Sequence, residues 1–248
     1  MEKNIGCNLC DIKLDFDFTF AFQPIVDINK KEIFAYEALV RGLHGEGAPE
    51  ILAKVNDKNR YQFDQACRIT CITKAQQLNI NECISINFLP NAVYSPELCL
   101  RTTIAAAENA NFPLEKIIFE VTENEQIKDP SKLLSIFKYY KERGFCTAID
   151  DFGAGYSGLG LLADFQPDFI KIDIKLVRNI HMSPVKQALI KGIILTANSL
   201  NIKIIAEGIE TAEEARWFKE NEIFLMQGFY FAKPGFESLP VVNNWELI

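Results

Sequence analysis

The segment FTFAFQPIVDINKKEIFAYEALV, residues 18–40, decides our interpretation of the fold. Its two halves, Phe18–Val26 and Ile33–Val40, are rich in β-branched and aromatic residues, as is typical of β-strands. Only Asp27–Glu32 separates them, and this stretch is too short for the helical crossover that joins parallel strands. We therefore expect the two strands to form an antiparallel hairpin.

The register of this hairpin follows from its turn, which we place near Asn29 and Lys30. Counting back from that turn puts Glu37 roughly opposite Phe22 and Gln23, because turn position sets the pairing of the two strands. Gln23 and Glu37 are therefore expected at the same end of the domain, which is predicted below to be a barrel.

Outward from the hairpin, further extended apolar segments alternate with stretches in which apolar residues recur every three to four positions, as in amphipathic helices. The extended segments are Cys83–Asn87, Ile117–Thr122, Phe145–Asp151, Phe169–Ile172, Ile202–Ala206 and Phe224–Gln227. The predicted helix starts are marked by Ser95-Pro96, Asp129-Pro130 and Ser183-Pro184 and by the capping-box pair Thr211 and Glu214. This alternation predicts an α/β fold with a parallel sheet, and eight strands favour closure into a barrel.

Composition limits the class of protein. A chain of 248 residues suits one barrel domain, which we place at residues 18–248, with residues 1–17 as a short N-terminal extension. The net charge of −7 argues against a protein that grips long nucleic acid through a basic surface. No apolar stretch has the length of a signal-peptide core or a membrane span. We expect a cytoplasmic protein that binds neither long nucleic acid nor membrane.

The seven cysteines are an odd number in a chain without secretory features, so we expect most of them to be reduced core thiols. Cys7 and Cys10 form a CxxC pair, which could be half of a zinc site or a redox pair. No second CxxC follows, and His44 and His181 are the only histidines, so we favour neither role.

Polar residues fall at the ends of the predicted strands. They are Glu37, Asn87, Glu120, Asp150, Asp151, Lys171, Glu207 and Gln227. The carboxyl ends of barrel strands converge on one face, where active sites are built. A single acidic residue at such an end is typical of a helix cap or a solvated turn. Five carboxylates around one mouth would repel one another unless cations neutralised them, so the set predicts bound metals.

The types of ligand atom indicate which metal ions the site would bind. Oxygen donors without clustered His or Cys suit Mg²⁺ or Mn²⁺ better than zinc. Asp150 and Asp151 leave a strand into a glycine-rich turn and can serve two neighbouring ions, an arrangement used for phosphodiester hydrolysis. Lys171 shares a strand face with Asp173. Either the two form an ion pair inside the barrel, or Lys171 stabilises an attacking hydroxide or a phosphate.

The glycine-rich residues 153–158 match the pattern GxGxxG after a strand, which is found in dinucleotide-binding proteins. We reject that function because Asp150 and Asp151 would crowd a pyrophosphate with negative charge, and because the helix that follows is short. The glycines are better explained as a mobile loop that reaches towards the metals and a subunit interface.

Seven motifs, in order between about residues 20 and 235, resemble one known family. They are EALVR (37–41), SIN (85–87), EVTE (120–123), DDFG (150–153), KID (171–173), AEGIE (206–210) and QGF (227–229). The series is similar to the EAL family of cyclic di-GMP phosphodiesterases. This resemblance implies a modified TIM (β/α)8 barrel with an antiparallel first strand. It also implies hydrolysis of cyclic di-GMP to linear pGpG and assembly as a homodimer.

The resemblance further implies a role for each motif residue. One divalent ion, Mg²⁺ or Mn²⁺, would be held by Glu37, Asn87, Glu120 and Asp150, and a second by Asp151 with shared ligands. Lys171 and Gln227 would position or activate the attacking water, and Glu207 would ligate metal or act as the base. The remaining roles would be substrate contact for Gln23 and Arg41, and anchoring of the glycine-rich loop for Glu123.

Two alternatives remain open. A degenerate member of this family would act as a cyclic di-GMP receptor or a protein-interaction module, although the complete set of ligands favours catalysis. An enolase-type lyase also carries carboxylates at strand ends, but its motif order does not match. The regulatory input could be a partner protein, the extension that carries the CxxC pair, or nothing.

Overall fold

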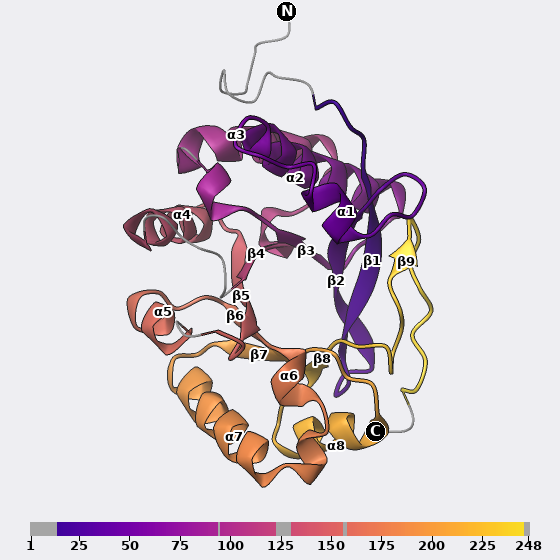
Figure 1. Ribbon diagram of the computed structural model, residues 1–248, viewed down its shortest axis with the longest axis vertical. Coiled ribbons are helices and arrows are strands. Elements are labelled where there is room, and N and C mark those ends of the chain that lie inside the picture. The colour runs from indigo at the N-terminus through magenta and orange to yellow at the C-terminus, as the bar shows by residue number, and fades with distance from the viewer. Residues whose placement is uncertain (1–13, 94, 123–129, 156–157, 246–248) are drawn as a thin grey trace, which may run out of the picture.

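The structure is a computed structural model that describes residues 14–93, 95–122, 130–155 and 158–245 (Figure 1). The strands are β1 (Thr19–Asp27), β2 (Glu32–Arg41), β3 (Cys83–Asn87), β4 (Ile117–Thr122), β5 (Cys146–Phe152), β6 (Phe169–Ile172), β7 (Lys203–Ala206), β8 (Leu225–Met226) and β9 (Gly235–Phe236). The α-helices are α1 (Ala48–Leu52), α2 (Arg60–Gln77), α3 (Pro96–Asn109), α4 (Pro130–Glu142), α5 (Gly158–Asp164), α6 (Ile174–Val177), α7 (Pro184–Ser199) and α8 (Ala212–Glu220). Short 3-10 helices are η1 (Pro90–Ala92), η2 (Leu114–Lys116) and η3 (Ile180–Met182).

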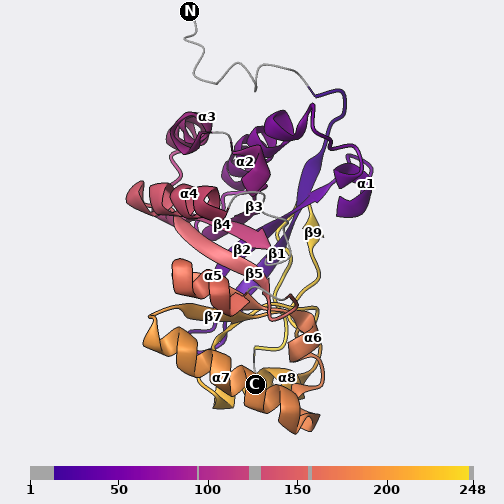
Figure 2. The ribbon, with the colours of Figure 1, turned by 60° about the vertical axis from the view of Figure 1, so that its left-hand side comes forward.

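Eight of these strands close into a barrel with helices around its outside (Figure 2). The strand order is β2-β3-β4-β5-β6-β7-β8-β1, and β1 pairs back onto β2. β1 is antiparallel to both β2 and β8, whereas the neighbours from β2 to β8 pair in parallel. The predicted α/β barrel with an antiparallel first strand is confirmed.

The hairpin has the predicted register. Gln23 pairs with Glu37 across β1 and β2. The turn is fixed by Asp27, whose carboxylate accepts the backbone N–H groups of Asn29 at 3.0 Å and Lys30 at 3.1 Å. An Asp side chain that bonds to the backbone two residues on favours a tight turn over further strand.

The predicted helix caps are present wherever the structure describes them. The hydroxyls of Ser95 and Ser183 each accept a backbone N–H three residues further on, at the starts of α3 and α7. Thr211 and Glu214 form a reciprocal capping box at the start of α8. Asp129 lies outside the described residues.

The sequence does not predict β9. β8 pairs with only the last two residues of β1, Val26 and Asp27. The edge of β1 that β8 leaves uncovered is met by β9, which pairs with Ala21 and Phe22. A strand of two residues shows no alternation of apolar and polar side chains, so no pattern signals it.

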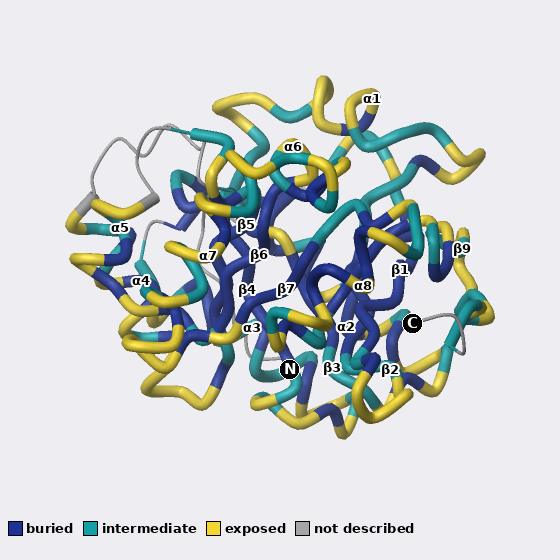
Figure 3. Tube along the Cα trace, turned by 90° about the horizontal axis from the view of Figure 1, so that it is seen from below, coloured by how far each residue is buried: buried dark blue, intermediate teal, exposed yellow. Residues whose placement is uncertain are grey.

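The barrel interior has an apolar layer beneath a polar layer. The apolar layer is the cluster of Ile25, Ala35, Ile118, Ala148, Phe169 and Ile205. On the parallel strands a polar residue follows two positions later, on the same face: Glu37, Glu120, Asp150 and Lys171. On the reversed strand β1 the polar Gln23 precedes the apolar residue. The polar layer therefore rests on a packed core, which Figure 3 shows as buried strands inside the more exposed helices.

Two larger apolar clusters fill the space between the strands and the surrounding helices. The described cysteines, Cys67, Cys71, Cys83, Cys99 and Cys146, are free thiols, as the composition predicts. Cys7 and Cys10 lie outside the described residues. Within the part of the chain that the structure describes, no helix combines the length and apolar character needed to cross a membrane.

Candidate active site

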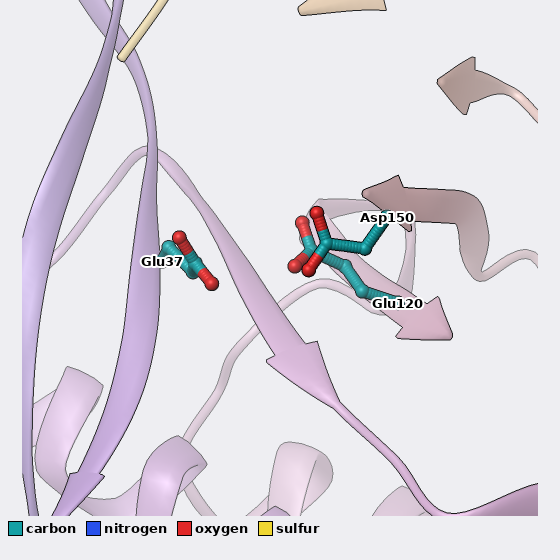
Figure 4. A group of neighbouring side chains, drawn as sticks. All are labelled: Glu37, Glu120 and Asp150. Atoms are coloured by element: carbon teal, nitrogen blue, oxygen red, sulfur yellow. The ribbon is translucent and has the colours of Figure 1, made fainter. Parts of the chain in front are cut away.

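Carboxylates from several strands converge in the polar layer of the barrel. Glu37 of β2, Glu120 of β4 and Asp150 of β5 project into the same interior space (Figure 4). All three are buried. Glu207, which directly follows β7, and Asp151, next to Asp150, lie beside them. The convergence predicted from strand ends is therefore present.

The ammonium of Lys171 lies at the centre of these carboxylates. Its Nζ atom lies 2.7 Å from Glu207, 2.9 Å from Glu120, 3.2 Å from Asp150 and 3.5 Å from Glu37. Burial disfavours the charged form of Lys171. The attraction of the surrounding carboxylates outweighs this effect and raises the pKa of Lys171 well above its ordinary value. Asp173 instead accepts the N–H of Lys175 and caps α6. Of the two alternatives for Lys171, the ion pair with Asp173 is therefore not the one that the structure shows.

Amide and hydroxyl groups orient two of the carboxylates. Gln227 Nε2 donates to Glu37 Oε2 at 2.7 Å, and Asn87 Nδ2 donates to Glu37 Oε1 at 3.3 Å. The Ser85 hydroxyl donates to Glu120. Gln227 Oε1 is buried and receives no hydrogen bond from any described residue. It is therefore an acceptor that can take a hydrogen from a water molecule or a ligand in the site.

The electrostatics of the site show an excess of negative charge. Burial raises the pKa of Glu120 to about 8 despite Lys171, and it raises the pKa of Glu207 well above its ordinary value. Burial and the charge of Asp150 raise the pKa of Asp151 to about 6. Asp150 differs: Lys171 and hydrogen bonds outweigh its burial and lower its pKa. One ammonium does not balance this many carboxylates, so a further cation would be stabilised here.

The carboxylates form two groups that could each hold a metal ion. One consists of Glu37, Glu120 and Asp150, and the other of Asp150, Asp151 and Glu207. Within each group the ligand oxygens lie within 4.8 Å of one another. Hard oxygen donors and surplus negative charge fit Mg²⁺ or Mn²⁺. Asp150 belongs to both groups, which fits two neighbouring ions that share one ligand.

Asp151 has an unusual backbone conformation. Its φ is +54°, in the left-handed region that residues other than glycine rarely adopt, and the pairing of β5 with β6 is irregular between Ile149 and Phe152. Consecutive residues of a regular strand point to opposite faces. The irregularity lets Asp150 and Asp151 offer oxygens to the same group, a device that sequence patterns do not reveal.

A cavity of about 220 Å³ adjoins these residues. It is lined by Gln23, Glu37, Asp151, Ile174, Glu207, Gly208, Glu210, Gln227, Gly228 and Phe229. Ile174 and Phe229 are exposed, so the cavity combines acidic and amide groups with an apolar wall. Gly228 is required by close packing, because a Cβ atom there would lie 2.0 Å from the carbonyl oxygen of Ile209.

The structure places the remaining predicted residues as follows. Gln23 lines the cavity and donates to the carbonyl of Ala232 at 3.2 Å. Arg41 is not among the residues that line the cavity, and its guanidinium donates to the carbonyl of Val40 at 2.8 Å. Glu123 lies outside the described residues.

Sequence reasoning missed several residues of the site. Ser85 carries a signal that could have found it, because it lies two positions before Asn87 on the same strand. Glu210 and Phe229 stand inside the quoted motifs but follow strands rather than ending them, so strand-end reasoning did not select them. Ile174 is an ordinary helix residue by sequence.

Known proteins share this sequence and fold. A model of the EAL domain family matches residues 12–234. The blue light- and temperature-regulated antirepressor BluF of Escherichia coli (strain K12) is 37% identical over 94% of this chain and 58% of its own. The cyclic di-GMP phosphodiesterase PdeR of the same organism is 42% identical over 51% of this chain and 19% of its own. The chain thus spans less than two thirds of the length of these two relatives.

Solved structures agree with this family. A standalone EAL protein from Vibrio cholerae O395, in its c-di-GMP-bound form, has 55% identity and a TM-score of 0.91. The match covers 93% of this chain and 98% of that one. The manganese and cyclic di-GMP complex of BlrP1 from Klebsiella pneumoniae has 37% identity and a TM-score of 0.84, over 89% of this chain and 56% of BlrP1. By sequence, barrel topology and the match across most of its length, the chain belongs to the EAL domain family.

Proposed function

We propose that this chain is a metal-dependent phosphodiesterase that hydrolyses cyclic di-GMP to linear pGpG, using two divalent ions to activate water. The observation that carries the proposal is that Asp150 belongs to two carboxylate groups beside one cavity. Two ions that share a carboxylate are a common device for phosphodiester hydrolysis. Relatives named cyclic di-GMP phosphodiesterases and a similar protein with bound c-di-GMP support this substrate.

The proposed ligands follow the two groups. Glu37, Glu120 and Asp150 would hold one ion, with Asn87 close enough to Glu37 to join them, and Asp150, Asp151 and Glu207 would hold the other. When bound, the ions lower the pKa of a water molecule and offset the charge of the phosphodiester. The oxygen donors suit either Mg²⁺ or Mn²⁺, and the manganese complex of BlrP1 supports the second.

Side chains of this molecule would orient the reactants. Gln227, fixed by its bond to Glu37, offers Oε1 to a hydrogen of the attacking water. Lys171 can donate to an oxygen that carries negative charge. Glu207, which lies beside Asp150 and Asp151, would ligate metal or take the proton that the water loses. Gln23 and Arg41 are the proposed substrate contacts, and Gln23 already lines the cavity.

Two substitutions test the assignment. Glu37→Ala and Asp150→Ala each remove a carboxylate from a proposed metal group, so pGpG formation should be abolished while circular dichroism stays unchanged. Mass spectrometry of reactions with Mg²⁺ or Mn²⁺ measures the product directly. If the folded Glu37→Ala variant still hydrolyses cyclic di-GMP, the assignment as a metal-dependent phosphodiesterase is contradicted.

A non-catalytic receptor is the second candidate. The similarity to BluF, which is named an antirepressor, is the observation that favours it. The two candidates differ in outcome, because a receptor binds cyclic di-GMP with metal present and releases no pGpG. The convergence of both carboxylate groups with Lys171 favours hydrolysis.

We further propose that the chain forms a homodimer. The exposed apolar side chains on and beside α7 include Met182, Val185, Leu189 and Leu195. A contiguous exposed apolar patch is typical of a protein interface, and Val185 and Leu189, four residues apart, share one face of the helix. Light scattering during size-exclusion chromatography should give the mass of two chains. The Leu189→Lys substitution should lower the measured mass towards that of one chain. A monomeric wild-type protein at micromolar concentration would contradict this proposal.

A further inference from the structure

Glu214, in the first turn of α8, is a fully buried carboxylate that lines no part of the cavity described above. Its Oε1 atom accepts the backbone N–H of Asn179 at 2.8 Å. Its Oε2 atom accepts the N–H groups of Glu210 at 2.9 Å and Thr211 at 3.2 Å. One side chain therefore satisfies three backbone donors.

These donors belong to two different loops. Asn179 lies between α6 and η3, after β6, and adopts a left-handed φ of +55°. Glu210 and Thr211 lie between β7 and α8. A capping box needs only the bond to Thr211, so the bonds to Asn179 and Glu210 go beyond helix capping. Glu214 thus ties the loop after β6 to the loop after β7.

The loop after β7 begins with Glu207, and bonds hold it along its length. The N–H of Glu207 donates to the carbonyl of Ile172 at 3.2 Å, and that of Ile209 donates to Gln227 at 3.0 Å. Gly208 packs so tightly against α6 that a Cβ atom would lie 2.3 Å from Ile174. A shift in either loop would therefore move Glu207 relative to Asp150 and Asp151.

We propose that Glu214 is a positioning residue for the group of Asp150, Asp151 and Glu207. By joining the two loops, it fixes the Glu207 carboxylate at the distance from both aspartates that one divalent ion requires. The inference rests on the proposed two-ion function. The group of Glu37, Glu120 and Asp150 has only Asp150 in common with it, so the other ion should depend much less on Glu214.

Calorimetric titration of the full chain with Mn²⁺ alone tests the proposal. Glu214→Gln keeps the size of the side chain but turns an amide NH₂ towards backbone donors on one side. We expect one Mn²⁺ binding event to weaken by about 10-fold, the lower end of the range for groups that hydrogen-bond directly to a metal ligand, while the other changes little. With cyclic di-GMP, kcat should fall at limiting Mn²⁺ and recover at high Mn²⁺.

Two control variants separate positioning from general stability. Thr211→Ala removes the hydroxyl that caps α8 but leaves the bond to Asn179, and Glu213→Gln makes the same charge change on the neighbouring exposed residue. Neither should alter Mn²⁺ binding. Equal weakening of Mn²⁺ in Thr211→Ala and Glu214→Gln, or unchanged Mn²⁺ binding in folded Glu214→Gln, would overturn the proposal.

If Glu214→Gln does not fold, Glu214→Asp takes its place, because the shorter carboxylate cannot reach both loops. Weaker binding of one Mn²⁺ ion by folded Glu214→Asp would support the proposal, and unchanged Mn²⁺ binding would overturn it. Because Mn²⁺ binding is measured without substrate, absence of pGpG formation would contradict the proposed function and leave the positioning test intact.

Discussion

The excess of carboxylates predicts that the protein without metal loses stability as the pH rises through neutrality. Burial raises the pKa of Glu120 from an ordinary value of 4.5 to about 8. Between these values the folded protein holds a proton on Glu120 that the unfolded chain has lost. Each such proton lowers the free energy of unfolding by about 1.4 kcal/mol per pH unit as the pH rises. Glu207, whose pKa is also raised, adds to the same slope.

Urea unfolding in EDTA at pH 6 and pH 7 measures this slope. The free energy of unfolding should fall by about 1.4 kcal/mol over that unit, because Glu120 supplies about one proton. Glu120→Gln should remove its share of the slope, since the amide does not titrate. Saturating Mn²⁺ should flatten or reverse the trend, because a metal ion binds the deprotonated ligands. Stability in EDTA that is constant or increases from pH 6 to 7 would refute the electrostatic reasoning.

Three further outcomes are expected. Asp151→Asn weakens the second ion group, so kcat should fall by about 10³-fold if an ion there supplies several kcal/mol; near-normal rates would remove the two-metal mechanism. Gln227→Ala deletes the free acceptor Oε1 and should lower kcat by about 10²-fold or more in steady-state assays, whereas an effect on KM alone would assign Gln227 to substrate binding. Ile205→Ala opens a cavity beneath the site and should cost about 2–5 kcal/mol in urea unfolding, and a cost below 1 kcal/mol would show that the apolar layer is loosely packed.

Much of the fold could be predicted because the decisive signals are local. The length of the loop after β1 excludes a crossover, and the alternation of strand residues then places Gln23 opposite Glu37. Strand ends placed Glu120, Asp150 and Lys171 at one face for the same reason. These features follow from the periodicity of apolar residues and from the lengths of loops, both of which can be read directly from a sequence.

The unpredicted features arise from contacts distant in sequence or from backbone conformation. The left-handed conformation of Asp151 depends on how β5 meets β6 and has no sequence signal of its own. The sequence offered Asp173, two residues away, as a possible ion-pair partner of Lys171. The four partners that the structure shows come from other strands and loops. Glu214 fits a capping box by sequence, and only the fold shows that it also reaches Asn179.

The reversed direction of β1 has a consequence for whatever is joined to its start. Thr19, the first residue of β1, pairs with Arg41, the last residue of β2. The chain therefore enters the barrel at the rim formed by the carboxyl ends of the parallel strands, where the carboxylates gather. In a barrel whose first strand runs parallel to the rest, the chain would enter at the opposite end. A domain, tag or partner protein attached before β1 would thus be joined to the barrel at the rim that carries the carboxylate groups, and not at the opposite end.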